Sequence, residues 1–130
     1  MLNHSLFPFI KGVSFFYFFM KVFSHHIYEY QKGLRNLVLH TMVATYQEAA
    51  IKKLKFNKID YVIQRIENNK INIFFGAEEC VAVIKQFIHK NLNEFTAEQD
   101  FILGIMLGYD RKIQCKRFLN YKQNSSLKTA

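Results

Sequence analysis

The chain has 130 residues, half of them apolar, which is enough for one domain with a substantial core. Its two cysteines are too few for a disulfide scaffold, lack the spacing of metal ligands, and indicate a reducing, cytoplasmic setting. The formal net charge of +8 favours acidic or phosphate-rich partners, although the basic residues are scattered along the chain.

Residues 1–19 differ from the rest of the chain, because two Phe-rich apolar runs flank Lys11 and Gly12. The second run is far shorter than the roughly 20 residues of a membrane span, and no Lys or Arg precedes Lys11, where a secretory signal would have a basic start. We therefore expect an extension upstream of a start at Met20, outside the domain. A hydrophobic anchor, an uncleaved signal and an ordered strand are the alternatives. No membrane contact is expected for residues 20–130.

Residues 20–121 are expected to form a single α+β domain. Ser24 is placed to cap a short helix that ends at Gly33, although the alternation there also fits a strand. The segment Leu37–Thr41 is apolar on both faces, which is typical of a strand covered on both sides. The spacing of Thr45 and Glu48 predicts a capping box at the start of the next helix.

The middle of the chain predicts a hairpin followed by a helix. Strands over residues 59–66 and 71–75 are joined by Asn68 and Asn69, which tolerate the positive φ of tight turns. The helix after Gly76 carries an apolar stripe of Cys80, Val83, Ile84, Phe87 and Ile88.

The last third predicts a long helix and a polar tail. Thr96 with Gln99 indicates a second capping box. We expect the inward side chains of this helix to be Phe101, Ile102, Ile105, Met106 and Tyr109. Gly104 and Gly108 leave a flat strip for another backbone. Gly108 is expected to break the helix, with Asp110 capping a further segment through Phe118, and residues 122–130 to form a disordered tail.

This order of elements predicts a βαββα two-layer sandwich. It is half of a ferredoxin-like fold, with the fourth strand missing and an extra long C-terminal helix. In the split arrangement Leu37–Thr41 lies at the sheet edge without a charge to protect it. We therefore expect a homodimer to which the first strand and the last helix contribute. Alternatively, the segment around Val22–Tyr30 or the last helix of the same chain covers this edge strand.

Three blocks of the sequence are specific as a set, namely HHIYEYQKGLRNLVLHT, INIFFG and EQDFILGIMLGYDRKIQCKRF. Together they resemble a bacterial family of small proteins catalogued only as a domain of unknown function, over roughly residues 21–121. The resemblance implies a small α+β domain that begins near Met20 and has no assigned activity. Relatives encoded beside a flavodoxin imply an accessory role in electron transfer. The element order is also similar to sulfur-carrier-type domains, but their paired cysteines and glycine-cysteine loop are absent from the sequence.

A metal site is one chemical hypothesis that the residues allow. On a helix, His25 and Glu29 lie one turn apart, with His26 beside them, so their side chains can aim at one ion. His40 on the neighbouring strand offers a further ligand. Surface and packing roles for the same residues are the alternative, because only their proximity in sequence is visible.

Cys115 is the candidate catalytic residue. Its neighbours Arg111, Lys112, Lys116 and Arg117 favour the thiolate, which is the nucleophilic form. A packed or merely exposed thiol is the alternative. A small polar pocket formed by Asp110 and Arg111 with Arg35 and Glu29 is a second hypothesis, and a helix restart capped by Asp110 is the alternative to it. The candidate binding residues are Arg35, Asp110, Arg111, Lys116 and Arg117.

No cofactor is expected, because no glycine-rich phosphate loop precedes a helix. Nucleic-acid binding would use Lys52, Lys53, Lys55, Lys58 and Arg65, with Tyr61 among them, but no recognition-helix or aromatic RNA motif is visible. We therefore expect a cytoplasmic, non-catalytic interaction or regulatory module with an acidic protein partner such as a flavodoxin. A thiol-dependent redox or transfer protein using Cys115 is the alternative, and nucleic-acid binding is the second.

Overall fold

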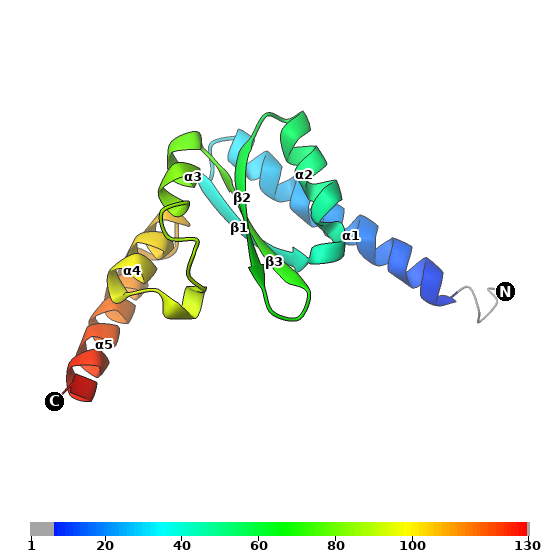
Figure 1. Ribbon diagram of the computed structural model, residues 1–130. Coiled ribbons are helices and arrows are strands. Elements are labelled where there is room, and N and C mark those ends of the chain that lie inside the picture. Colours follow the sequence, from blue (N-terminus) through cyan, green and yellow to red (C-terminus); the bar gives the residue numbers. More distant parts are fainter. Residues whose placement is uncertain (1–6, 130) are drawn as a thin grey trace.

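A three-stranded antiparallel sheet lies at the centre of the fold (Figure 1). The computed structural model describes the backbone of residues 7–129 and the side chains of residues 15–125. The strands are β1 (Leu37–Val43), β2 (Asp60–Ile66) and β3 (Lys70–Gly76), in the order β1-β3-β2. Both outer strands run antiparallel to β3 and hence parallel to each other, which is the predicted split arrangement with β1 at an edge.

Five α-helices surround the sheet within the described residues. They are α1 (Phe7–Gln31), α2 (Gln47–Phe56), α3 (Glu78–Ile84), α4 (Ala97–Met106) and α5 (Arg111–Thr129). The α+β class and the long C-terminal helix are confirmed. The sheet is the middle of three layers, however, where two were expected: α1 and α2 pack on one face, while α3 and α4 pack on the other with α5 alongside α4 (Figure 1).

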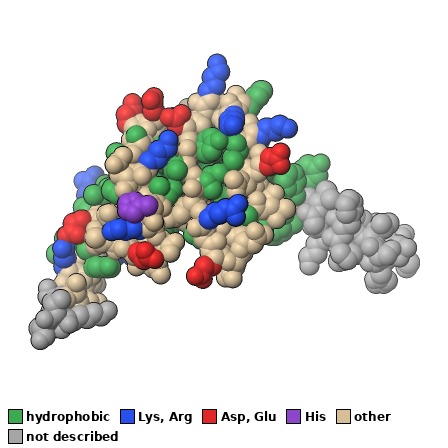
Figure 2. Space-filling model, in the orientation of Figure 1, with side chains coloured by type: hydrophobic (Ala, Val, Ile, Leu, Met, Phe, Trp, Pro, Cys, Tyr) green, Lys and Arg blue, Asp and Glu red, His purple; other side chains and the backbone are tan. Residues whose placement is uncertain are grey.

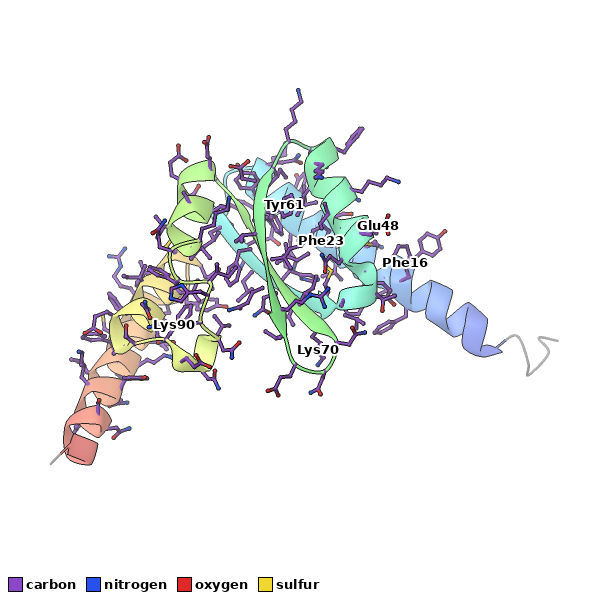
Figure 3. The ribbon with its side chains drawn as sticks, in the orientation of Figure 1. Phe16, Phe23, Glu48, Tyr61, Lys70 and Lys90 are labelled. Carbon is purple, nitrogen blue, oxygen red and sulfur yellow. The ribbon has the colours of Figure 1, made fainter. Side chains whose placement is uncertain are left out.

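The first core lies between the sheet and the pair α1 and α2. Phe23 of α1 (labelled in Figure 3) is fully buried. Its ring centre lies 5.4 Å from that of Phe75. Further out along α1, the ring of Phe16 lies 5.2 Å from that of Tyr46, and Phe19 packs against the same core. Phe16 and Phe19 therefore contact the domain, although residues 1–19 were expected outside it. Among the described residues, no helix is long and apolar enough to cross a membrane.

The second core lies on the opposite face of the sheet. The side chains that it buries are not all those predicted from the sequence. Helix α4 buries Leu103, and Leu107 follows it into the core, whereas Ile102 and Ile105 are exposed. The reason is that α5 packs beside α4 and selects its face. The fully or nearly fully buried members of this core are Leu37, Phe74, Val81, Ile84, Phe95, Leu103 and Leu107. Val81 therefore takes the place expected for Val83, which is exposed, and Cys80 is only partly buried.

Several predicted turn and cap signals are confirmed. Asn68 and Asn69 have φ values of 62° and 56° in the β2–β3 turn. Gly33 follows α1 with φ 78°, as a helix-terminating glycine should. The capping box of Thr96 and Gln99 is present, with both hydrogen bonds at 3.1 Å. The Asp110 carboxylate accepts a hydrogen bond from the Ile113 N–H at 2.9 Å and so caps α5.

Two predicted helix caps do not form among the described residues, and the last helix ends later than predicted. Thr45 lies in a short 3₁₀ helix, Ala44–Tyr46, and α2 begins after it without a side-chain cap, so the box with Glu48 does not form. Ser24 lies inside α1 and donates to the Met20 carbonyl, because the helix begins well before it. Helix α5 continues to Thr129, through most of the segment expected as a disordered tail.

Candidate functional site

A row of hydrogen-bonded polar side chains crosses all three strands on the α3 face of the sheet. Thr41 Oγ1 donates to Asn72 Oδ1 at 2.6 Å, and Asn72 Nδ2 donates to Gln64 Oε1 at 3.1 Å. Gln64 Nε2 then donates to the Lys90 carbonyl at 2.6 Å. Asn72 and Gln64 are both buried, so each needs these bonds. The row is therefore a structural device that ties the strands to the segment after α3.

A cleft of about 430 Å³ lies between β1 and the helical hairpin α4–α5. Its walls are mainly apolar and come from Leu39 of β1 together with Leu92, Phe95, Leu103, Gly104 and Leu107. Mostly apolar concave surfaces with a few polar groups are typical ligand or partner sites. The polar groups of this cleft are Asn93, Asp100, Tyr109, Gln114 and Arg117.

Gln114 is the most distinctive of these polar groups. Its residue is only 8% exposed, and its side-chain amide has no hydrogen-bond partner among the residues that the structure describes. It lies against Gly104, where a Cβ atom would stand 2.0 Å from Gln114 Oε1. The predicted glycine strip on α4 therefore admits a side chain of α5. The amide lines the cleft and is not among the fully buried polar atoms that lack a partner, so it is available to a donor or acceptor that enters the cleft.

The rim of the cleft carries an ion pair between α4 and α5. Arg117 Nε lies 2.7 Å from Asp100 Oδ2, and Arg117 Nη2 lies 3.1 Å from Asp100 Oδ1. These hydrogen bonds from Arg117 to Asp100 raise the pKa of the guanidinium above its usual value. Because Arg117 is committed to Asp100, it does not act as a free cation beside Cys115.

A second depression, of about 440 Å³, lies along the outer side of the same hairpin. This apolar groove is lined by Phe101 and Ile102 of α4 and by Cys115, Phe118 and Leu119 of α5, with Glu98 at its end. Lys122 pairs with Glu98 across it, which lowers the pKa of that carboxyl group. Cys115 is an exposed thiol in this groove.

The basic residues around Cys115 fall into two groups. Arg117 and Lys122 are paired with acidic side chains of α4. Arg111, Lys112 and Lys116 are exposed, and within the described part of the chain none of them has an acidic partner. The three unpaired cations therefore occupy the first two turns of α5, beside the apolar groove.

The histidines of the metal hypothesis cluster at the end of α1. Glu29 Oε1 lies 3.5 Å from His25 Nε2 and 3.3 Å from His26 Nδ1, and Glu29 Oε2 lies 3.9 Å from Arg35 Nη1. The structure thus brings the predicted ligands together, but the carboxylate also faces the guanidinium. Within residues 15–125, no group of three or more His, Cys, Asp or Glu side chains is arranged to hold a metal ion.

His40 lies on β1 next to this cluster. Its ring centre is 5.3 Å from that of His26, and its Nε2 is buried without a hydrogen-bond partner among the described residues. Burial, with a smaller contribution from His26, lowers its pKa to about 4. His40 is therefore neutral at pH 7.

The expected polar pocket does not form. No interaction between described residues joins Glu29 and Arg35 to Asp110 and Arg111. Arg35 pairs with Glu29, while Asp110 caps α5. The lysines considered for nucleic acid are also divided, since Lys53 donates to Ser24 Oγ on α1. The side chains visible in Figure 2 show Lys and Arg interspersed with Asp and Glu, without one continuous basic patch on that face.

The sequence profile of the family described as "Protein of unknown function (DUF2023)" matches residues 21–121. The chain belongs to this family. No curated protein matches it. The DUF2023 match includes the sheet, α4 and the first half of α5, so the cleft and the apolar groove both lie within it. The predicted resemblance to a family catalogued as a domain of unknown function is thereby confirmed.

Gln114 was missed as a site residue by sequence reasoning, and Leu39 was expected only at the edge of the sheet and not as a wall of the cleft. Leu39 reads as an ordinary strand residue, and Gln114 as one polar residue in a polar helix. The only usable signal was Gly104, since a glycine inside an apolar helix often marks the close approach of another element. Gly104 does not indicate, however, which element approaches it.

Proposed function

We propose that this DUF2023 protein is a non-catalytic interaction module of the cytoplasm that binds an acidic protein partner on the outer surface of α4–α5. A flavodoxin is the candidate partner, following the resemblance described above. The observation that carries the proposal is the set of exposed cations, Arg111, Lys112 and Lys116, that lack an acidic partner among the described residues beside an apolar groove.

The position of these cations on α5 supports a role in binding. The N-terminus of a helix carries partial positive charge and favours acidic side chains. Asp110 supplies one as the cap of α5, but the first turn after it has none. Arg111 and Lys112 add two positive charges there against the single carboxylate of Asp110, so a net repulsion remains. An acidic partner surface would offset this repulsion and would be steered toward it by the field.

The adjoining groove supplies the apolar part of the surface. Ile102 is 39% exposed and Leu119 is 63% exposed, so both present apolar area to water. Interfaces gain most of their affinity from a few apolar anchors, while charges at the rim set the rate and the choice of partner. The surface is thus suited to an acidic partner that contributes at least one apolar side chain.

A charge-reversal experiment tests the proposal. Binding to a flavodoxin is measured by calorimetry for the wild type, for Lys112→Glu with Lys116→Glu, and for the control Lys52→Glu with Lys55→Glu on α2. Both double variants change the net charge equally. We expect the α5 variant to weaken binding about tenfold or more and the control about twofold at most, with wild-type affinity falling as salt rises. Equal losses in the two variants, or no binding by the wild type, would refute the proposal.

A thiol-dependent role for Cys115 is the second candidate, because the thiol is exposed and lies inside the groove. The pH dependence of its alkylation separates the two functions. A thiol that titrates near pH 8.5 is ordinary and leaves the interaction module as the function. A thiol that reacts fully at pH 6 favours redox or transfer chemistry. Cys115→Ser provides the blank for this measurement.

A further inference from the structure

Strand β1 is an open edge of the sheet. Its sheet neighbour is β3, and no backbone hydrogen bond from residues 37–43 to any other described segment joins its outer side. Leu39 and His40 are partly exposed and Thr41 is exposed. The outward N–H and C=O groups of β1 therefore form a template for another strand.

The two edges of the sheet are protected to different degrees. On β2, Asp60 and Arg65 are exposed and charged, which discourages pairing. The sequence of β1 is LVLHTMV, and its one titratable residue, His40, is neutral at pH 7. On a chain with a net charge of +8, β1 is therefore an uncharged surface on which a second positive chain meets little repulsion.

The cleft beside β1 indicates what the added strand must carry. Leu39 faces the cleft, so the odd-numbered side chains of β1 point to the α4–α5 side. In an antiparallel pair, directly opposite residues share a face. The added strand thus needs an apolar side chain at the position that faces the cleft, and its polar groups would meet the unpartnered amide of Gln114.

We propose that the partner strand is β1 of a second copy of this chain. Two β1 strands related by a two-fold axis would pair antiparallel into a six-stranded sheet, and Leu39 of each copy would enter the cleft of the other. The strand β1 fits its own edge because it is extended and uncharged and carries the partly exposed Leu39 on the face of the cleft. This dimer uses a surface distinct from the α5 cations and does not depend on the proposed function.

Sedimentation of the full chain tests the dimer. We expect a dimer at about 10–50 µM, within the micromolar range of modest interfaces. Leu39→Lys should weaken the dimer at least tenfold, because it places a charge at the junction. Val62→Lys is the matched control, since Val62 and Leu39 both lie opposite Phe74, at the two edges of the sheet. Gln114→Ala should weaken the dimer about threefold to tenfold by removing its side-chain amide.

The fold of each variant is checked by circular dichroism and thermal unfolding. Gln114→Ala keeps the test informative if Leu39→Lys does not fold, because its amide has no partner among the described residues. A clean monomer at about 100 µM, or a dimer that neither Leu39→Lys nor Gln114→Ala weakens, overturns the proposal. A monomeric chain that captures an extended peptide on β1 would equally overturn it, because the occupant would then be another protein.

Discussion

His40 lies on β1 with its ring against the aromatic side of α1. Its ring centre is 5.5 Å from that of Phe23 and 6.3 Å from that of Phe19. The burial that this packing causes lowers the pKa of His40 from 6.5 to about 4. Between these two pKa values the unfolded chain binds a proton at His40 that the folded chain does not. The contribution of neutral His40 to the free energy of unfolding is therefore fully present above pH 6.5 and is lost as the pH drops toward 4.

His40→Phe should therefore flatten the acid side of the stability profile. We expect the wild type to lose on the order of 1–2 kcal/mol through His40 between pH 7 and 4.5, a modest value because the ring is only partly buried. Urea unfolding at several pH values measures this difference. His89→Phe is the matched control for the substitution itself, since His89 is exposed and lies away from the cluster around His40. Identical profiles for His40→Phe and the wild type would contradict the assignment.

At the scale of elements, Gly76 ends β3 just before α3, where its backbone lies tightly against that of Asn36. Its φ is 149°, and a Cβ atom there would lie 2.2 Å from the Asn36 carbonyl oxygen. That carbonyl also accepts the hydrogen bond of the Ala77 N–H at 2.9 Å. Neither backbone can withdraw without loosening the junction between β1 and β3.

Gly76→Ala should for this reason destabilise the fold by about 3 kcal/mol or more, since it adds a backbone clash to an unfavourable φ. Gly33→Ala is the matched control, because Gly33 also has positive φ but open space around it. It should cost only about 1 kcal/mol, from the left-handed conformation alone. Chemical denaturation of both variants separates the effect of the clash from that of the backbone conformation. Equal losses in the free energy of unfolding would show that no clash exists at Gly76.

The elements that the sequence predicted well are those with local causes. The β2–β3 hairpin follows from alternation and the Asn68-Asn69 turn, and the start of α4 follows from its capping box. The buried face of α4 could not be predicted, because FILGIMLG is apolar on every side and the choice is made by α5. The cleft was likewise hidden, since it joins Leu39 to Gln114, which are distant in sequence.

At the scale of the whole molecule, α1 and α5 project from opposite ends (Figure 1). The two ends differ in how they meet the domain. Phe19 packs on the first core, whereas its neighbour Phe18 is 62% exposed. This contrast within one helix turn changes the expected effect of removing residues 1–19, because the chain would lose the packed rings of Phe16 and Phe19 as well as exposed apolar surface.

We accordingly expect Phe19→Ala to destabilise the fold by about 1–2 kcal/mol, as a partly buried ring should. Phe18→Ala should change stability by less than about 0.5 kcal/mol. A chain beginning at Met20 should show at least the loss seen for Phe19→Ala. Thermal unfolding of the three variants decides the matter. An unchanged melting temperature for the Met20 chain would mean that the outer part of α1 does not stabilise the domain.

Strand β3 is shared by the two cores, because Ile71, Ile73 and Phe75 face α1 and α2 while Phe74 faces α3 and α4. Neither core can open fully without disrupting β3, on which the other core also packs. Amide protons of β3 should therefore exchange with solvent deuterium only when the whole domain unfolds. Their exchange rates report the global free energy of unfolding, and a binding partner on either face should slow the same set of protons.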